Sequence, residues 1–209
     1  MSIRTVIQSS TYFQWLSAPR NCESEKISPP NEISFTINRK RYTADGRVPA
    51  NTTLNTFIRD YAQLKGTKFM CEEGGCGSCV VSVRSKHPTT KQDNDYAVNS
   101  CLVLVFSCHG WNITTIEGLG GRMDGYHLLQ ATLSKFNGTQ CGFCSPGMVM
   151  NMYSLMQEGN LTTNKLEESF AGNTCRCTGY RPILDAFKSL CADAPQELRN
   201  KCLDIEVSS

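Results

Sequence analysis

Hydrophobic and polar residues alternate in short runs through the first half of the chain. Segment 33–37 has an apolar side chain at every second position, which predicts a half-buried strand, and residues 41–44 can form its return strand. Residues 54–61 place apolar side chains three and four positions apart, as on one face of a short helix. Segments 80–84 and 113–117 are rich in β-branched residues and are predicted as further strands. This order predicts an α+β domain.

Three stretches lack such a pattern and are predicted to connect the others. Residues 1–31 show no sustained period and end in Ser-Pro-Pro-Asn, which disfavours regular structure, so we interpret them as an extension or linker. Residues 86–94 are polar and predict a loop. The glycine-rich stretch Gly118–Gly121 is the predicted boundary between two domains, because the pattern changes after it.

The second half of the chain predicts helices. Four segments carry apolar side chains three or four positions apart, namely residues 126–136, 147–157, 163–170 and 182–190. Pro146 and Pro182 lie where two of these helices would begin, a position that proline favours. His127 is interpreted as a helix-capping or core histidine, with a proton or pterin contact as the alternative. The predicted domains are an extension at 1–31, an α+β domain at 32–118, a helical domain at 122–191 and a tail or linker at 192–209.

Composition and charge remove some classes of partner. The 209 residues carry a net charge of only +2, with Lys and Arg scattered, so we expect no nucleic acid as partner. The longest uncharged apolar stretch, residues 101–108, is far shorter than the roughly 20 residues of a membrane helix, so we expect no membrane span. The first residues lack the apolar core of a secretory signal, and we expect the cytoplasm, with the peroxisome and the mitochondrion as alternatives.

Twelve cysteines are a high number for this length, and they fit either disulfides in an oxidising compartment or metal ligation in a reducing one. Four of them have the C-x4-C-x2-C…C spacing of plant-type [2Fe-2S] ferredoxins. We expect the glycines of this loop to adopt positive φ and to bring backbone N–H groups to the sulfurs. The cysteines are Cys71, Cys76, Cys79 and Cys101, and the glycines are Gly74, Gly75 and Gly77.

A second set of four cysteines consists of two short pairs 30 residues apart, Cys141 with Cys144 and Cys175 with Cys177. Each pair precedes a predicted helix, whose positive end would lower the thiol pKa and favour a metal ligand. The usual zinc pattern is two C-x2-C pairs about 15 to 20 residues apart, so the spacing favours iron–sulfur, with zinc and disulfides as alternatives. The remaining cysteines are interpreted as ordinary reduced thiols, namely Cys22, Cys108, Cys191 and Cys202.

Five motifs between about residues 33 and 190 carry a resemblance to a known family: CEEGGCGSC, VNSCL, TTIEGLG, GTQCGFCSPGMVM and AGNTCRCTGYRPIL. This part of the chain resembles the N-terminal iron–sulfur region of the molybdenum hydroxylases, the xanthine dehydrogenase and aldehyde oxidase family. Its sequence looks most like those of insect aldehyde oxidases. The resemblance implies a β-grasp ferredoxin-like domain followed by a four-helix [2Fe-2S]-binding domain, with one cluster in each.

The resemblance also implies a function. Electrons would pass one at a time from a molybdopterin centre to the helical-domain cluster, then to the ferredoxin cluster, then to FAD. In the family, the residues matching Gln140 and Cys177 lie against the pterin. The implied partners are flavin and molybdopterin domains or subunits of one enzyme, which is a dimer when complete.

The leading hypothesis is therefore the electron-transfer component of an oxidoreductase that hydroxylates aldehydes or N-heterocycles. The sequence shows no substrate pocket, flavin site or molybdenum ligands, so we expect the chain alone to hydroxylate nothing. It would be a fragment, a truncated product without activity or a separate small subunit. The alternative from another class is a free-standing ferredoxin-like electron carrier.

Overall fold

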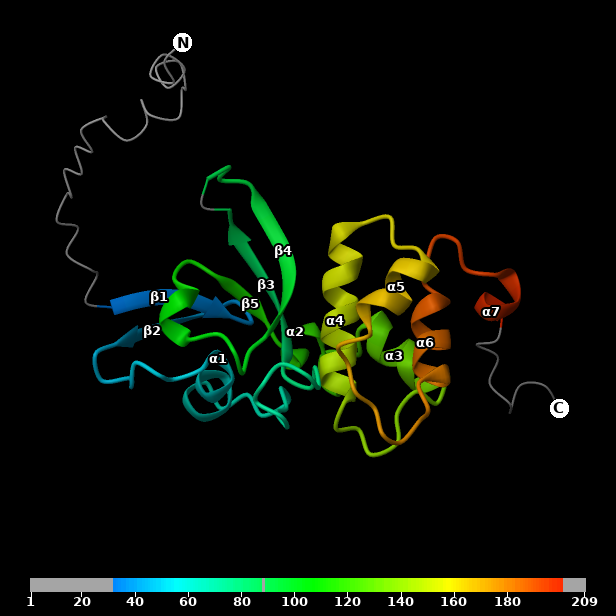
Figure 1. The fold of residues 1–209 in the computed structure, drawn as a ribbon, viewed down its shortest axis with the longest axis horizontal. Helices are drawn as coiled ribbons and strands as arrows, with labels where there is room; N and C mark the ends of the chain where they lie inside the picture. Colours follow the sequence, from blue (N-terminus) through cyan, green and yellow to red (C-terminus); the bar gives the residue numbers. More distant parts are fainter. Residues whose placement is uncertain (1–31, 88, 201–209) are drawn as a thin grey trace, which may run out of the picture. The chain divides into compact units, whose positions relative to one another are not determined.

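The computed structural model describes residues 32–87 and 89–200, which belong to one compact unit (Figure 1). A five-stranded sheet with short helices is followed by a group of helices, which confirms the predicted α+β class. The elements are β1 (Glu32–Ile37), β2 (Lys40–Asp45), α1 (Leu54–Thr56), the π-helical turn η2 (Phe57–Tyr61), β3 (Val80–Lys86), β4 (Asp93–Asn99), the 3-10 turn η3 (Val105–Cys108), β5 (Asn112–Thr114), α2 (Ile116–Leu119), α3 (Leu128–Lys135), α4 (Ser145–Glu158), α5 (Thr163–Ser169), α6 (Arg181–Lys188) and α7 (Gln196–Asn200).

The sheet has the order β2-β1-β5-β3-β4. Strands β1 and β2 form the predicted antiparallel hairpin, β1 runs parallel to β5, and β3 is antiparallel to both β4 and β5. The alternating side chains of β1 point into a core shared with the predicted helical segment 54–61. Its buried members include Phe35, Ile37, Leu54 and Phe57.

Two predictions for the sheet were wrong in part. Strand β4 begins within the segment predicted as a loop, because its backbone pairs along the whole of β3 although its sequence is acidic and polar. The strand predicted at 113–117 ends at Thr114 and is followed by α2. It ends there because the N–H of the buried Thr115 donates to the Asn38 side chain at 2.9 Å instead of to a neighbouring strand.

The four helices predicted in the second half are confirmed as α3, α4, α5 and α6. Helix α3 begins after His127, which caps it, one of the two structural roles predicted for this residue. The Nδ1 of His127 accepts from the Leu129 N–H at 3.2 Å, and Gln130 accepts from the His127 N–H at 2.8 Å. Pro146 lies in the first turn of α4, where a backbone N–H is not needed. These helices enclose a second core, separate from that of the sheet.

Helix α4 lies between the two cores. It contacts β3 and β4 on one side and α3 and α5 on the other (Figure 1). Its first turn approaches the loop that precedes β3 so closely that a Cβ on Gly147 would lie 2.2 Å from the carbonyl oxygen of Gly77. Only glycine fits at this crossing. Within the described part of the chain, no helix combines the length and the apolar character of a membrane span.

We predict that Gly147→Ala lowers the free energy of unfolding by about 2 kcal/mol, because an added methyl group must displace backbone in a packed contact. In a helix without this contact the same change would be stabilising by roughly 1 kcal/mol. Chemical denaturation of the cluster-free chain measures the difference. The matched control is Gly172→Ala, since no atom lies within 4 Å of a Cβ there and its φ is not positive. Equal stability of both variants would contradict the prediction.

Candidate metal centres

The first set of four cysteines comes together from two segments of the sheet domain. Cys71, Cys76 and Cys79 lie in the loop between η2 and β3, and Cys101 lies just after β4. The Sγ atoms of Cys79 and Cys101 are 3.3 Å apart, and the Cys76 thiol helps to lower the pKa of Cys71. Cys71 is half-buried and the other three are buried. The spacing in the sequence therefore corresponds to one cluster of thiols in space.

The loop between Cys71 and Cys79 turns its backbone N–H groups toward sulfur. Hydrogen bonds from the backbone of Glu73 foremost, and also from Cys76 and Gly75, lower the pKa of Cys71 to about 7. Gly74 and Gly77 adopt the expected positive φ of 83° and 67°. The expectation was wrong for Gly75, because the left-handed step falls on Glu72 instead, with φ of 56°.

Burial acts in the opposite direction on the innermost thiol of this set. Loss of solvent raises the pKa of Cys79 to about 12, since a thiolate is poorly solvated there without a cation. A metal that binds this thiol must displace its proton, so binding releases protons and supplies the missing positive charge. The set thus combines Cys71, which forms a thiolate near neutral pH, with Cys79, which becomes a thiolate only when a metal binds.

The second set assembles at the end of the helical domain that faces the first set's loop. Cys144 is the N-cap residue of α4, and Cys175 and Cys177 lie in the segment before α6. The four thiols act on one another: Cys175 and Cys141 help to raise the pKa of Cys144, and Cys141 and Cys175 help to raise that of Cys177. Cys175 is buried and Cys144 half-buried, whereas Cys141 and Cys177 are exposed. This set therefore has one inner and one outer pair.

The expected effect of the helix ends on the thiols was wrong for Cys144. Burial, followed by the neighbouring Cys175 thiol, raises the pKa of Cys144 to about 12 although it lies at the N-terminus of α4. Burial also acts to raise the pKa of Cys175, but hydrogen bonds from the side chain and backbone of Thr178 outweigh it and lower the pKa. The hydrogen bonds from Thr178 therefore make Cys175 the more acidic of these two thiols.

Both sets have donor chemistry that fits a [2Fe-2S] cluster. Over residues 32–87 and 89–200, no three His, Cys, Asp or Glu side chains converge as ligands of one metal ion would. The Sγ atoms of Cys79 and Cys101 are 3.3 Å apart, and a [2Fe-2S] cluster takes two thiolates at each of its two irons. All ten cysteines that the structure describes are free thiols. Of the four outside both sets, Cys108 and Cys191 pack in the two cores as predicted, and Cys22 and Cys202 lie outside the described residues.

The two sets are joined by hydrogen bonds between their loops. The N–H of Thr174 donates to the carbonyl oxygen of Cys76 at 2.8 Å. The side-chain Nδ2 of Asn173 donates to the carbonyl oxygen of the next residue, Gly77, at 3.2 Å. Thr174 directly precedes Cys175, so backbone that carries one thiol set touches backbone that carries the other. Reasoning from the sequence missed both residues, because a polar residue before a cysteine does not indicate a contact 96 positions away.

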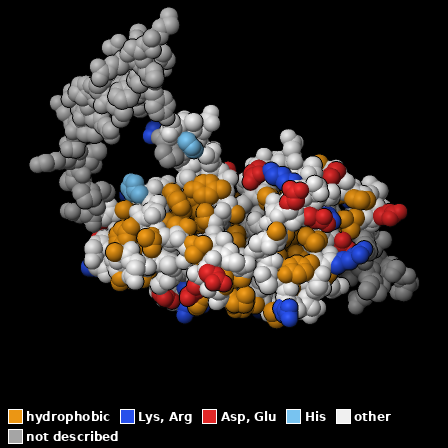
Figure 2. All heavy atoms as spheres, in the orientation of Figure 1, with side chains coloured by type: hydrophobic (Ala, Val, Ile, Leu, Met, Phe, Trp, Pro, Cys, Tyr) orange, Lys and Arg blue, Asp and Glu red, His pale blue; other side chains and the backbone are white. Residues whose placement is uncertain are grey.

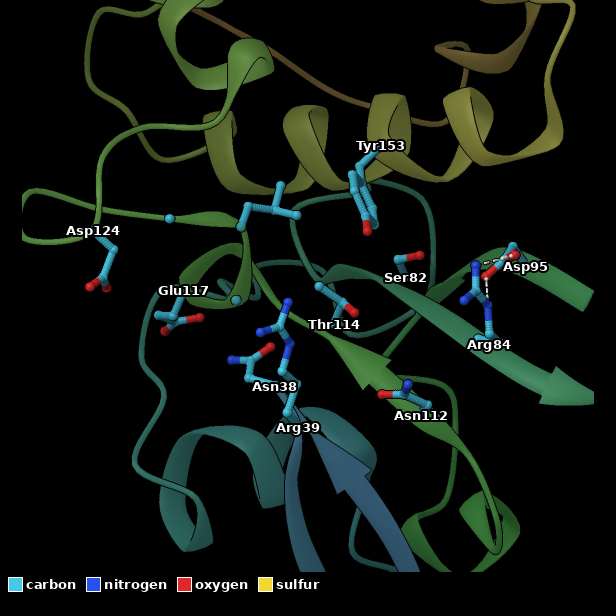
Figure 3. Close-up of a pocket in the computed structure, with 13 residues that line it drawn as sticks. Asn38, Arg39, Ser82, Arg84, Asp95, Asn112, Thr114, Glu117, Asp124 and Tyr153 are labelled. Atoms are coloured by element: carbon cyan, nitrogen blue, oxygen red, sulfur yellow. Dashed lines mark hydrogen bonds and ion pairs between the residues drawn. The ribbon is translucent and has the colours of Figure 1, made fainter.

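The residues predicted to face a pterin, Gln140 and Cys177, are both exposed. A polar cavity of about 490 Å³ lies elsewhere, between α4 and the sheet, and none of the eight cysteines lines it (Figure 3). Tyr153 of α4 points into it toward Ser82 and Thr114. Arg84 and Asp95 form an ion pair at its edge, with an N–O distance of 2.8 Å. The sequence did not indicate this cavity.

Comparison with known proteins identifies the two domains. The model of the 2Fe-2S iron-sulfur cluster binding domain matches residues 35–106, and that of the [2Fe-2S] binding domain matches residues 115–188. Among curated relatives, the chain is 42% identical over 179 residues to indole-3-acetaldehyde oxidase of Zea mays, covering 79% of this chain and 13% of that protein. It is 47% identical over 151 residues to xanthine dehydrogenase of Oryza sativa subsp. japonica, covering 71% of this chain and 11% of that protein.

The solved structure of quinoline 2-oxidoreductase from Pseudomonas putida 86 contains a chain of similar extent. It superposes with a TM-score of 0.65 at 31% identity, covering 82% of this chain and 94% of that chain. This chain belongs to the xanthine dehydrogenase and aldehyde oxidase family. It represents the family's iron–sulfur region, with a ferredoxin-like domain, a helical domain and a [2Fe-2S]-binding site in each.

The likeness is limited to part of the family's larger members. The chain covers 14% of aldehyde oxidase 1 of Oryctolagus cuniculus, with 40% identity over 183 residues, and 16% of the aldehyde oxidoreductase of Desulfovibrio gigas, with a TM-score of 0.65. It thus spans less than a quarter of the length of these curated relatives. The nearer likeness to insect aldehyde oxidases within the family stays a prediction.

We predict that Cys71 is the thiol most easily alkylated near neutral pH in the cluster-free chain. Its pKa of about 7 lies below the ordinary value of 9.0, so the reactive thiolate is present from about pH 7 upward and is lost as the pH falls below it. Iodoacetamide labelling followed by peptide mass spectrometry across pH 6 to about 9 measures the midpoint. Cys108 is the control, because burial raises its pKa to about 12. Labelling of Cys71 only above about pH 8.5 would contradict the prediction.

Proposed function

We propose that the eight cysteines of the two sets bind two [2Fe-2S] clusters. In the ferredoxin-like domain one iron would take Cys71 and Cys76 and the other Cys79 and Cys101, whose Sγ atoms are 3.3 Å apart. In the helical domain one iron would take the exposed Cys141 and Cys177, and the other the less exposed Cys144 and Cys175. The bound clusters would supply one-electron redox chemistry, and the protein supplies burial and hydrogen bonds to sulfur.

The observation that best supports electron transfer is the 2.8 Å hydrogen bond from the Thr174 N–H to the Cys76 carbonyl oxygen. This bond links Cys76 of the first set to Thr174, which directly precedes Cys175 of the second set. A carrier of two independent clusters has no need of such contact, whereas passage of an electron between clusters depends on a short, packed route. We therefore assign the two sites to one path.

The direction of the path rests on exposure and on the family. The outer pair of the helical domain, Cys141 and Cys177, and the neighbouring Gln140 are exposed, which suits contact with a molybdopterin domain or subunit. Electrons would enter there and leave from the ferredoxin-like domain to FAD in another domain or subunit. The substrate would be an aldehyde or an N-heterocycle, since aldehyde oxidases, a xanthine dehydrogenase and a quinoline oxidoreductase are among the relatives. We further propose that the complete enzyme is a dimer and lies in the cytoplasm.

Surface side chains next to both sets support contact with such partners. Figure 2 shows hydrophobic side chains at the surface over the sheet and over the helices. Large exposed apolar residues adjoin the candidate ligands in the chain, namely Phe69, Met70 and Leu102 for the first set and Phe143 for the second. Such residues beside a redox centre are typical of a surface that another domain covers.

We predict that anaerobic reconstitution of the chain gives about four irons and two distinct one-electron paramagnetic resonance signals on reduction. Cys76→Ala should abolish one signal and Cys144→Ala the other, because each removes a ligand from a different set. Cys108→Ala is the matched control and should keep both signals, since its thiol packs in the sheet core. Bound zinc without sulfide would overturn the assignment. Co-elution of the native protein with flavin and molybdenum partners separates the proposed role from that of a free-standing carrier.

A further inference from the structure

The side chain of Asn173 lies at the point where the two thiol-bearing loops meet. It is buried, with 5% of its surface exposed. Its Nδ2 donates to the Gly77 carbonyl oxygen at 3.2 Å, and its Oδ1 accepts from Nδ2 of Asn151 in α4 at 2.8 Å. Asn151 also donates to the carbonyl oxygen of Ser169 at the end of α5 at 3.0 Å. Two helices therefore hold Asn173, and Asn173 holds the loop of the ferredoxin-like domain.

The hydrogen bond of Asn173 runs beside the one that links the loops. Asn173 and Thr174 are consecutive residues, and they donate to the consecutive carbonyl oxygens of Gly77 and Cys76. The two bonds together fix the position of one loop along the other, as two rungs fix the register of a strand pair. If the bond from Asn173 is lost, the carbonyl oxygen of Gly77 keeps only a long hydrogen bond of 3.4 Å from the Val80 N–H.

The surroundings leave little room for another arrangement. A Cβ on Gly77 would lie 2.5 Å from the carbonyl oxygen of Gly172, and one on Gly147 would lie 2.2 Å from the carbonyl oxygen of Gly77. The loops thus touch through backbone atoms, and Asn173 is the side chain that bonds across this contact. A buried polar group in such a place must be paired, so its loss shifts the loops and does not simply leave a gap.

We propose that Asn173 is a positioning residue for electron transfer between the two clusters. It touches neither thiol set directly and acts by keeping the Thr174 N–H on the Cys76 carbonyl oxygen. This inference rests on the proposed function. Because electron transfer weakens steeply as the gap between two centres widens, a small separation of the loops slows transfer while both clusters stay bound.

Two variants of Asn173 and one control test the proposal in the reconstituted full chain. Asn173→Asp keeps the shape and the acceptor for Asn151, but an ionised carboxylate has no N–H to give to Gly77. Asn173→Leu removes both bonds without adding charge. Asn94→Asp is the matched control, because it adds the same charge on the exposed strand β4 and its side chain touches neither loop.

The measurements are iron and sulfide content, the potential of each cluster, the magnetic dipolar broadening between the two reduced clusters, and the rate at which an electron injected by flash photoreduction equilibrates between them. We expect both Asn173 variants to keep both clusters, to show weaker dipolar broadening and to equilibrate about tenfold more slowly, the scale of a lost supporting hydrogen bond. Asn173→Leu should leave both potentials near those of the parent. Asn94→Asp should match the parent in rate and broadening.

Three results would overturn the proposal. The first is a fully loaded Asn173→Leu chain whose rate and broadening stay within about twofold of the parent. The second is loss of a cluster from both variants, which would assign Asn173 to cluster retention. The third is a parent chain that binds no clusters at all, which would overturn the proposed function as well. The first two leave the proposed function intact, so the two failures are distinguishable.

Discussion

The close approach of two backbones is the constraint on which the rest of the structure depends. The loop carrying Cys76 and the segment leading to Cys175 touch through a peptide hydrogen bond of 2.8 Å, and the first turn of α4 passes over the same loop. This contact requires glycine at positions 77 and 147, since any side chain there would meet a carbonyl oxygen. It also requires that α4 serve both domains, lying against the sheet and against the other helices. Two separate cores thereby hold one shared redox region.

The chemistry of the thiols follows from a balance between burial and hydrogen bonding. Backbone N–H groups lower the pKa of Cys71, whereas desolvation raises the pKa of Cys79 and Cys144 to about 12. Cys79 in one set and Cys144 in the other therefore stay protonated until a cation binds. Such a site gains its charge balance only from the metal, which couples cluster binding to proton release and to folding of the loops. Exposure differs as well, because Cys141 and Cys177 of the helical domain are exposed, whereas the described thiols of the ferredoxin-like domain are buried or half-buried.

Polar side chains, not apolar packing alone, set the geometry where the domains meet. Asn173 bonds to Asn151 and to the Gly77 carbonyl oxygen, and the buried Thr115 is bonded to Asn38 and to Glu117. Hydrogen bonds are directional, so these residues specify one arrangement, whereas apolar surfaces tolerate sliding. For electron transfer the distinction matters, because small displacements of loops change a rate more than they change stability.

The sequence by itself determined much of this protein. The two-residue period of β1, the helical spacing of α3 to α6 and the cap at His127 are local patterns, and they predicted elements that the structure confirms. Cysteine spacing grouped eight thiols into two sets, and family resemblance predicted the domain order. Strand β4, the break at Thr115, the positive φ of Glu72 in place of Gly75 and the raised pKa of Cys144 were decided only by the tertiary structure. Asn173 and Thr174 belong with these, because each depends on neighbours distant in the chain, and no local pattern records burial or a partner 96 residues away.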